Sequence, residues 1–187
     1  MTKMIEGNMI SPCVVVYEDI IKNCDALINK AEVDFQWSKG KVGSNENMKI
    51  LEEHRNVDRI VLSPSYKNDI TWFSLSQLIW QYGNAYADDH NISFSNMEDP
   101  ELLRYFPNEG HYNIHVDSFP GRQRIFSCII YLNDVESGGE THFNRINLTV
   151  KPKRGRMVIF PSDYVHSHEA KTPKSGEKFV VVTWFNP

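Results

Sequence analysis

The stretch LLRYFPNEGHYNIHVDSF, residues 102–119, opens the half of the chain that decides the fold. Its two apolar runs flank Pro-Asn-Glu-Gly at 107–110, which is typical of a turn between two strands. It ends on His115-Val116-Asp117, and because side chains alternate along a strand, His115 and Asp117 are expected on one side, where both could bind one ion. This short pair is a weak signal alone, since such matches also arise by chance.

Short apolar runs punctuated by Gly, Pro and Asn continue outward from this stretch to the end of the chain. They predict strands at Leu102–Phe106, His111–Val116, Gln123–Leu132, Thr141–Phe143, Asn147–Val150, Arg156–Phe160, Val165–Ala170 and Glu177–Phe185. A series of short strands with turns between them predicts a double-sheet jelly roll, or double-stranded β-helix, over residues 101–187.

Residues 1–100 are expected to support this core. We predict strands and helices, in chain order, at Val14–Tyr17 (strand), Glu18–Val33 (helix), Asn56–Leu62 (strand) and Ile70–Ala87 (helix). The apolar stripe of the second helix suits packing against a sheet. We therefore expect an α+β fold, with N-terminal helices packed on one sheet of the jelly roll and residues 1–187 as a single domain.

The polar stretch Ser38–Glu53 has no periodicity and is interpreted as a surface loop. Within it, residues 40–53 are rich in Gly, Ser and Asn and are expected to form a mobile flap over the site. Lys41 and Arg55 are candidates for contact with a substrate when that flap closes.

The bulk composition excludes several classes of protein. The net charge of -4 and the pI near 6.0 argue against a nucleic-acid or anionic-membrane binder. No apolar run is long enough to cross a bilayer, and the N-terminus does not read as a signal peptide. The cysteines Cys13, Cys24 and Cys128 suit buried thiols in a reducing compartment, so we expect a cytoplasmic protein.

A second histidine is needed to complete a metal site with the first pair. Tyr164, His166, His168 and Ala170 are predicted to share one face of a strand, so either histidine could take this place. A turn through residues 173–176 would fold the last strand back beside His168, which favours that residue.

The same turn would bring Lys178 close to the metal, where its ammonium could hold an acidic co-substrate. The run that follows, Phe179–Val182, reads as a strand buried on both sides, which argues against a solvated surface lysine. Two histidines and one carboxylate leave half of an octahedral iron coordination sphere open. Together these residues indicate a chemical function that none of them indicates alone.

At this point the chain resembles the iron(II)- and 2-oxoglutarate-dependent oxygenases, in their prolyl 4-hydroxylase-like branch. The matching segments are residues 102–119, RIFSCIIYLNDVESGGETHF (124–143), VKPKRGRMVIFPSDYVHSHEA (150–170) and SGEKFVVVTWF (175–185). In that branch a glycine and a basic residue follow the distal ligand histidine at fixed spacings. Gly176 and Lys178 satisfy both spacings when counted from His168 and neither when counted from His166.

The resemblance implies a role for each matching position. The iron ligands would be His115, Asp117 and His168. Lys178 would pair with the distal carboxylate of 2-oxoglutarate, and Ser127 and Tyr105 would be further co-substrate contacts. Tyr112 and Trp184 would border the substrate channel.

The activity implied by the resemblance is that of a dioxygenase using Fe(II), 2-oxoglutarate and O2, with ascorbate as a candidate reductant. It would release succinate and CO2 and hydroxylate a peptide, with a prolyl residue as one candidate. Asp117 favours hydroxylation, because related halogenases lack this carboxylate. The small size is similar to that of phage- or bacterium-encoded members, which for a phage protein would mean the host cytoplasm.

Two alternatives stay open. One is the same chemistry on a free amino acid or another small molecule, and the other is a catalytically silent jelly roll that binds metal. Nucleobase demethylation is not expected, because no arginine follows Arg156. The oligomeric state does not follow from the sequence.

Overall fold

The computed structural model describes residues 5–43, 48–62 and 69–187. Its strands are β1 (Asn8–Ser11), β2 (Val14–Tyr17), β3 (Ser38–Lys39), β4 (Arg55–Asn56), β5 (Asp58–Val61), β6 (Asn96–Met97), β7 (Glu101–Tyr105), β8 (His111–His115), β9 (Phe126–Tyr131), β10 (Thr141–Phe143), β11 (Leu148–Val150), β12 (Met157–Pro161), β13 (His168–Ala170) and β14 (Lys178–Asn186). Its helices are α1 (Cys24–Asp34), α2 (Ile70–His90) and the short 3-10 helix η2 (Tyr164–His166).

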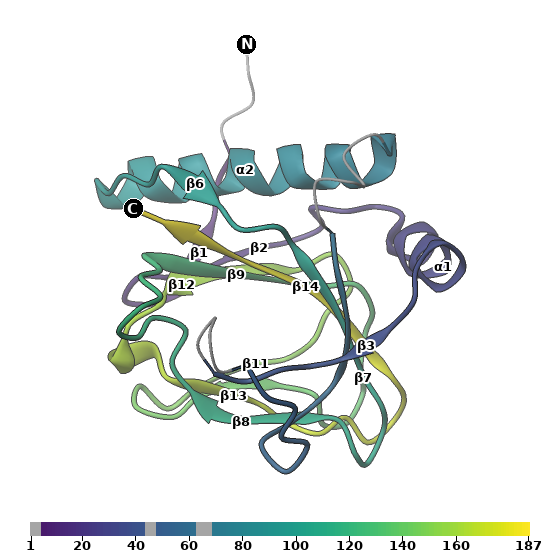
Figure 1. The fold of residues 1–187 in the computed structure, drawn as a ribbon. Coiled ribbons are helices and arrows are strands. Elements are labelled where there is room, and N and C mark those ends of the chain that lie inside the picture. The colour runs from purple at the N-terminus through teal and green to yellow at the C-terminus, as the bar shows by residue number, and fades with distance from the viewer. Residues whose placement is uncertain (1–4, 44–47, 63–68) are drawn as a thin grey trace.

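Within these residues the strands form two antiparallel sheets that face each other (Figure 1). The larger sheet has the order β1-β2-β12-β9-β14-β7-β5-β3, with β6 also paired to β14, and the smaller has the order β11-β10-β13-β8-β4. Alternate residues of the larger sheet point at the smaller one and form an apolar cluster, which includes Leu103, Ile129, Val158 and Val180. The chain is therefore mostly sheet.

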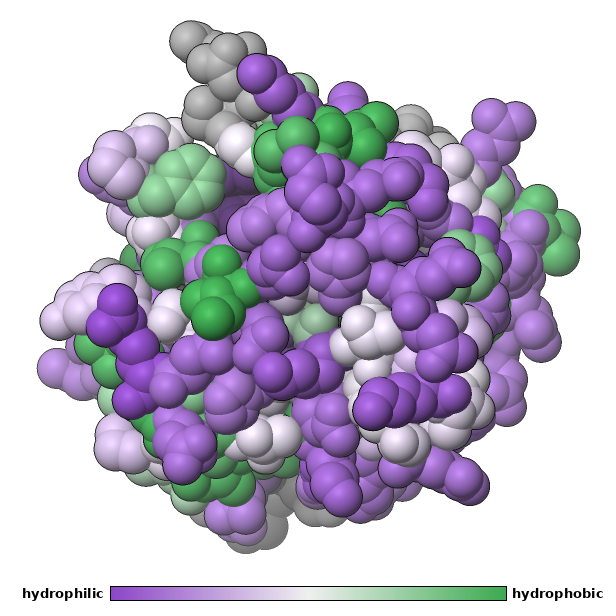
Figure 2. All heavy atoms as spheres, turned by 90° about the horizontal axis from the view of Figure 1, so that it is seen from below, coloured by the Kyte–Doolittle hydropathy of each residue, from purple (hydrophilic) through white to green (hydrophobic). Residues whose placement is uncertain are grey.

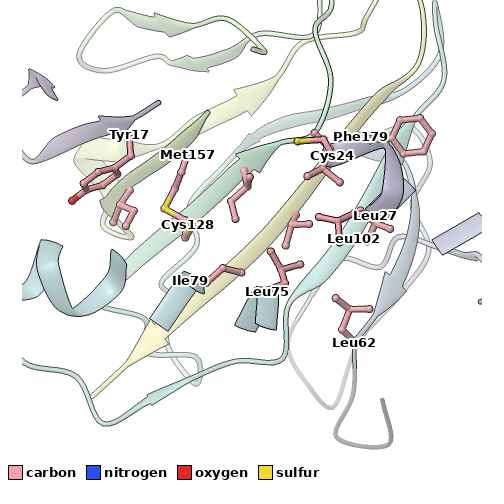
Figure 3. Close-up of a cluster of buried hydrophobic side chains, with 14 of the residues drawn as sticks. Tyr17, Cys24, Leu27, Leu62, Leu75, Ile79, Leu102, Cys128, Met157 and Phe179 are labelled. Atoms are coloured by element: carbon pink, nitrogen blue, oxygen red, sulfur yellow. The ribbon is translucent and has the colours of Figure 1, made fainter. Parts of the chain in front are cut away.

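The other face of the larger sheet is covered by the long helix α2, which lies across it in Figure 1. Leu75 and Ile79 of this helix belong to one buried cluster with Leu102 and Cys128 of the sheet (Figure 3). The helix lies close to the sheet at Gly83, where an added Cβ would come within 2.4 Å of the Phe185 ring. Because both faces are covered, Lys178–Phe185 of β14 is buried throughout.

The side of the molecule opposite α2 has a different character. Figure 2 shows mostly hydrophilic side chains on this face, and Asn113 and Ile114 of β8 are exposed. The smaller sheet therefore has one face toward the larger sheet and one toward solvent. No helix among the described residues is long and apolar enough to span a bilayer.

The predicted strand Val14–Tyr17 is confirmed, but the first helix begins at Cys24 and not at Glu18. Asp19 has a positive φ of 55°, which helical residues do not adopt, and the Asn23 side chain caps the helix by accepting a bond from the Ala26 N–H at 3.3 Å. The apolar spacing of the helix continues back through Ile20 and Ile21, so it does not mark the helix start. The polar residues around them, Asp19 and Asn23 in particular, are the sequence signal for a turn before the helix.

The predicted strand Val165–Ala170 is wrong in its first half. Tyr164–His166 is the turn η2, capped by the Asp163 carboxylate, which accepts a bond from the His166 N–H at 3.1 Å. The strand itself starts at His168. The expected common face of Tyr164, His166, His168 and Ala170 therefore does not exist.

The expected flap at residues 40–53 includes residues 44–47, which lie outside the described residues. Its described ends are tied to the fold. Gly40 N–H donates to the Val57 carbonyl at 2.8 Å, and Val42 and Lys49 form a short antiparallel bridge. Mobility of the segment stays a prediction.

Candidate metal and co-substrate site

Three side chains of the predicted site converge between the two sheets. β13 and β8 are antiparallel neighbours, and their register sets His168 directly opposite His115, with Asp117 two residues beyond the end of β8. Nε2 of His115 is 3.6 Å from one oxygen of Asp117, and Nε2 of His168 is 3.8 Å from the other. One ligand atom from each residue lies within 4.8 Å of the others, which is a suitable arrangement for one metal ion.

The orientation of both imidazoles is set by backbone carbonyls. Nδ1 of His115 lies 2.9 Å from the Asn113 carbonyl, and Nδ1 of His168 lies 3.0 Å from the His166 carbonyl. A carbonyl only accepts, so each Nδ1 carries the proton and donates it. Each Nε2 therefore has a free lone pair on the side of Asp117, as a metal ligand requires.

The surroundings favour the protonation states that bind metal. Burial, followed by the neighbouring His168, lowers the pKa of His115, which favours the neutral imidazole. Burial alone would raise the pKa of Asp117, but the neighbouring His168, His115 and Arg124 and the bond from Ser127 lower it, which favours the ionised carboxylate. A neutral imidazole beside an ionised carboxylate is ready to coordinate a cation without first losing protons.

Lys178 lies in the same pocket and is 1% exposed. It is the first residue of β14 and pairs with Tyr105 of β7. Its Nζ donates to the Gly139 carbonyl at 3.0 Å and lies 4.0 Å from the centre of the Tyr105 ring. Burial lowers the pKa of Lys178 to about 7, with Glu140 acting in the opposite direction. Lys178 forms no ion pair with any described residue, so its ammonium suits an acidic ligand.

One pocket joins Lys178 to the side chains of His115, Asp117 and His168. Its walls between these groups are apolar, formed by Ile129, Val180 and Val182 among others. Thr141 also lines this pocket and accepts a bond from the Tyr131 hydroxyl at 2.7 Å. Neither Thr141 nor Tyr131 was singled out in the sequence, although Tyr131 shares the inward parity of Ser127 along β9.

Ser127 lies at the other end of the pocket from Lys178. It pairs with Trp184, six residues along β14 from Lys178. Its hydroxyl donates to Asp117 at 2.6 Å and lies 2.7 Å from the Ser162 hydroxyl. The structure thus sets Ser127 against Asp117, whereas the resemblance implied contact with the co-substrate carboxylate beside Lys178.

Tyr112 stacks on His115, with ring centres 3.5 Å apart and an angle of 12° between the planes. Simple alternation along β8 would place these two side chains on opposite faces. The register against β13 shifts between His168 and Ala170, and this irregularity brings both rings to the same side. Sequence alternation does not predict such a shift.

Trp184 packs under Arg124, whose guanidinium carbon is 3.5 Å from the centre of its ring. Arg124 also forms two bonds of 2.6 Å to Glu98 and lies 3.9 Å from Asp117. The sequence did not single out Arg124. This residue lies before the start of β9, so alternation along the strand does not indicate where its side chain points.

His166, the alternative third ligand, is turned away from the other side chains. Its Nδ1 is 2.8 Å from the Asp163 carboxylate, and it does not belong to the group of His115, Asp117 and His168. The 3-10 turn separates it from the strand that carries His168.

Known proteins resemble this chain in sequence and in fold. Residues 100–186 match the family described as the 2OG-Fe(II) oxygenase superfamily. The chain is 36% identical over 115 residues to a "Putative prolyl 4-hydroxylase" of Acanthamoeba polyphaga mimivirus, a match that covers 51% of this chain and 47% of that protein. The chain therefore matches about half the length of this curated relative.

Two solved structures share the fold. One is the viral collagen prolyl hydroxylase of Paramecium Bursaria Chlorella virus-1 in complex with 2OG, with a TM-score of 0.69 and 23% identity over 92% of this chain and 95% of that chain. The other is a prolyl hydroxylase of Trichoplax adhaerens in complex with a hypoxia inducible factor peptide fragment, with a TM-score of 0.75 and 16% identity over 93% of this chain and 83% of that chain. These matches confirm the predicted architecture at the level of a mostly-sheet, prolyl hydroxylase-like fold, and the family match agrees with Fe(II) and 2-oxoglutarate as cofactors. Residues 100–186 of the chain thus match the 2OG-Fe(II) oxygenase superfamily, and the chain is similar to prolyl hydroxylases in sequence and fold.

Proposed function

We propose that this protein is an Fe(II)- and 2-oxoglutarate-dependent dioxygenase that hydroxylates a peptide, with a prolyl residue as the first candidate target. One observation carries the proposal: a single pocket holds two histidines with Nε2 facing Asp117, the aspartate itself, and a buried lysine that has no acidic partner among the described residues. The first three suit a divalent metal and the last suits a dicarboxylate.

In this proposal His115, Asp117 and His168 hold the metal. Their Nε2 and carboxylate oxygens face one another, and the Nδ1 atoms are tied to carbonyls, so the donor set fits Fe(II) without rearrangement. Bound Fe(II) and 2-oxoglutarate supply the oxidising chemistry, in which decarboxylation of the co-substrate to succinate and CO2 accompanies transfer of one oxygen atom from O2 to the substrate.

Lys178 and Tyr105 orient the co-substrate. The Lys178 ammonium binds the distal carboxylate, and the Tyr105 ring packs against the same amine. The apolar walls at Val180, Val182 and Ile129 exclude water from the space between this anchor and the metal ligands. Ser127 holds Asp117 in its coordinating orientation and does not touch the distal carboxylate.

The substrate enters past Tyr112 and Trp184. Both rings line the pocket, and Tyr112 lies directly on the ligand His115. Peptide substrates are favoured over free amino acids because the relatives and solved structures are described as prolyl hydroxylases, one of them with a bound peptide fragment. We further propose that residues 1–187 form one domain, with the sheets of residues 101–187 as a jelly roll and the N-terminal helices as its support.

The test is turnover. The purified protein is incubated with Fe(II), 2-oxoglutarate, O2 and a panel of proline-containing peptides, and succinate and oxygenated peptide are measured by mass spectrometry. The proposal predicts both products, and His168→Ala abolishes them whereas His166→Ala keeps them. If no succinate forms in the presence of any peptide although metal and 2-oxoglutarate bind, the protein is a silent binding module.

A further inference from the structure

The pocket opens onto a rim that carries an excess of positive charge. Four arginines line this opening, next to Tyr112, Asp117 and Trp184: Arg55, Arg59, Arg122 and Arg124. We call these four residues the arginine rim. Arg55 and Arg59 come from the adjacent strands β4 and β5, and Arg122 and Arg124 from the loop that leads into β9, so folding brings together two separate parts of the chain.

The first half of the arginine rim shares a single glutamate. Arg59 on β5 donates to Glu101 on β7 at 2.8 Å, and Arg55 approaches the other oxygen of Glu101 at 3.4 Å. Arg55 also donates to the Lys41 carbonyl at 2.9 Å. Arg55 is 7% exposed, yet its Nε has no hydrogen-bond partner among the described residues, and the same holds for Nε of Arg59. Both Nε atoms are covered by protein, and the two guanidinium groups share one carboxylate, so this half of the rim keeps an excess of positive charge.

The second half shares another glutamate. Glu98 accepts two bonds of 2.6 Å from Arg124 and one of 3.1 Å from Arg122. The side chain of Arg124 is 5% exposed and that of Arg122 is 26% exposed, so Arg122 is the member with open access to solvent. Four guanidinium groups thus surround two glutamates, with the metal-site Asp117 3.9 Å from Arg124 as a third carboxylate, on a chain whose net charge is -4.

We propose that the arginine rim selects a substrate that carries carboxylate side chains beside the residue to be oxidised, and so an acidic peptide. This inference rests on the proposed function. Arg124 lies 3.9 Å from Asp117, and the guanidinium of Arg55 lies 4.8 Å from the centre of the Tyr112 ring that stacks on His115. An anion bound at the rim is therefore close to the metal ligands, within a few residues of the oxidised position at about 3.3 Å per residue of extended peptide.

A peptide fits the rim better than a free amino acid. Arg55 and Arg59 surround Glu101, whereas Arg122 and Arg124 surround Glu98. The rim therefore has two separate clusters of two guanidinium groups around one glutamate, and so two places for anions. One α-carboxylate fills only one of them, whereas acidic side chains on both sides of a target residue fill both. Guanidinium groups bind carboxylates with paired hydrogen bonds, which adds selectivity to the long-range attraction.

The experiment compares matched peptides. Ten-residue peptides with a central proline carry either Glu or Gln at the flanking positions and are otherwise identical. Their Kd is measured with Mn(II) and 2-oxoglutarate bound to the full chain, and their kcat/KM is measured with Fe(II). We expect the Glu peptides to bind on the order of tenfold more tightly, and we expect this preference to shrink as salt rises, because screening weakens exposed charge pairs.

Arg122→Gln is the test variant and Arg154→Gln the matched control. Both arginines are ion-paired and partly exposed, with side-chain exposures of 26% and 34%, but Arg154 pairs with Asp25 of α1 and does not line the rim. The Glu preference should fall several-fold in Arg122→Gln and stay unchanged in Arg154→Gln. Free proline and free glutamate form the third arm and should bind without dependence on Arg122.

Three results overturn the inference. Equal binding of Glu and Gln peptides, no binding by either, or an Arg122-dependent preference for the free amino acids would each do so. Failure of the proposed function has a separate signature: 2-oxoglutarate then fails to bind, or no succinate forms with any compound. The arginine rim can therefore be wrong while the dioxygenase assignment stands.

Discussion

Replacing Lys178 by Met separates the role of this residue in binding from its role in folding. Met keeps an unbranched side chain as long as the aliphatic part of Lys and removes the ammonium that we assign to the distal carboxylate of 2-oxoglutarate. The metal ligands lie on β8, just beyond its end and on β13, and none of them bonds to Lys178. The variant should therefore lose affinity for 2-oxoglutarate and keep its affinity for metal.

The size of the loss follows from the burial of the amine. Lys178 is 1% exposed, so the bond it forms with a carboxylate is charge-assisted and shielded from water. Such a bond contributes about 1.5–3 kcal/mol, which corresponds to roughly 10–150-fold in Kd.

The ligand-free protein should respond in the opposite direction. Burial lowers the pKa of Lys178 to about 7, so below that pH the folded state holds an unfavourable charge, and the cost disappears as pH rises from about 7 toward the unfolded value of 10.5. Met removes this cost, on the order of a few kcal/mol, and leaves the Gly139 carbonyl without its donor, which costs about 1–3 kcal/mol. The Tm of ligand-free Lys178→Met at pH 6 should thus be no lower than that of the wild type.

The assay is thermal unfolding with and without Mn(II) and with increasing 2-oxoglutarate. A ligand that binds only the folded state stabilises it by RT ln(1 + [L]/Kd), so the Tm of the wild type should rise at ligand concentrations that leave the Tm of the variant unchanged. Lys171→Met, an exposed lysine paired with Glu169, is the control and should behave as the wild type. If Lys178→Met bound 2-oxoglutarate as tightly as the wild type, Lys178 would not be the anchor and the assignment of the pocket would be wrong.

Three further predictions concern the same pocket. His168→Ala should lose metal affinity by more than tenfold in a titration with Mn(II), whereas His166→Ala should retain it, since His166 faces Asp163; equal losses would contradict the ligand set. Ser127→Ala removes the 2.6 Å bond to Asp117 and should weaken metal binding by about 10-fold with little change in the 2-oxoglutarate Kd measured at saturating metal; a loss confined to 2-oxoglutarate would instead return Ser127 to the co-substrate. The affinity for 2-oxoglutarate should be constant below pH 7 and fall above it, because the pKa of the free Lys178 amine is about 7 and only the ammonium pairs with the carboxylate. Calorimetry across this pH range should show that the weaker 2-oxoglutarate affinity of Lys178→Met does not fall with pH.

Much of the site could be predicted because its spacing is local. His115 and Asp117 are two residues apart at the end of one strand, and Lys178 follows His168 across one turn and opens the next strand. Strand alternation and turn residues act over such short distances, so the chain itself carries the signal. The helix over residues 70–90 was predictable for the same reason, since its apolar stripe repeats over several turns.

The errors lie where a short polar contact or a register shift overrides the periodic pattern of apolar residues or the alternation along a strand. Apolar spacing from Ile20 onward suggested a longer first helix, but the Asn23 cap starts it at Cys24. Alternation placed His166 beside His168, but the Asp163 carboxylate folds Tyr164–His166 into a 3-10 turn. Alternation also failed for Tyr112, where a register shift against β13 brings its ring onto His115.

By itself the sequence determined the series of short strands, the His-x-Asp pair and the distance from His168 to Lys178, because neighbours in the chain decide these features. Only the tertiary structure decided that Ser127 bonds Asp117 and that Lys178 has no acidic partner in the part of the chain that the structure describes. It also decided that Arg55, Arg59, Arg122 and Arg124 share two glutamates at one opening. These contacts join residues from different strands and loops, and the pairing of strands across the sheets, which no local pattern specifies, sets the distances between them.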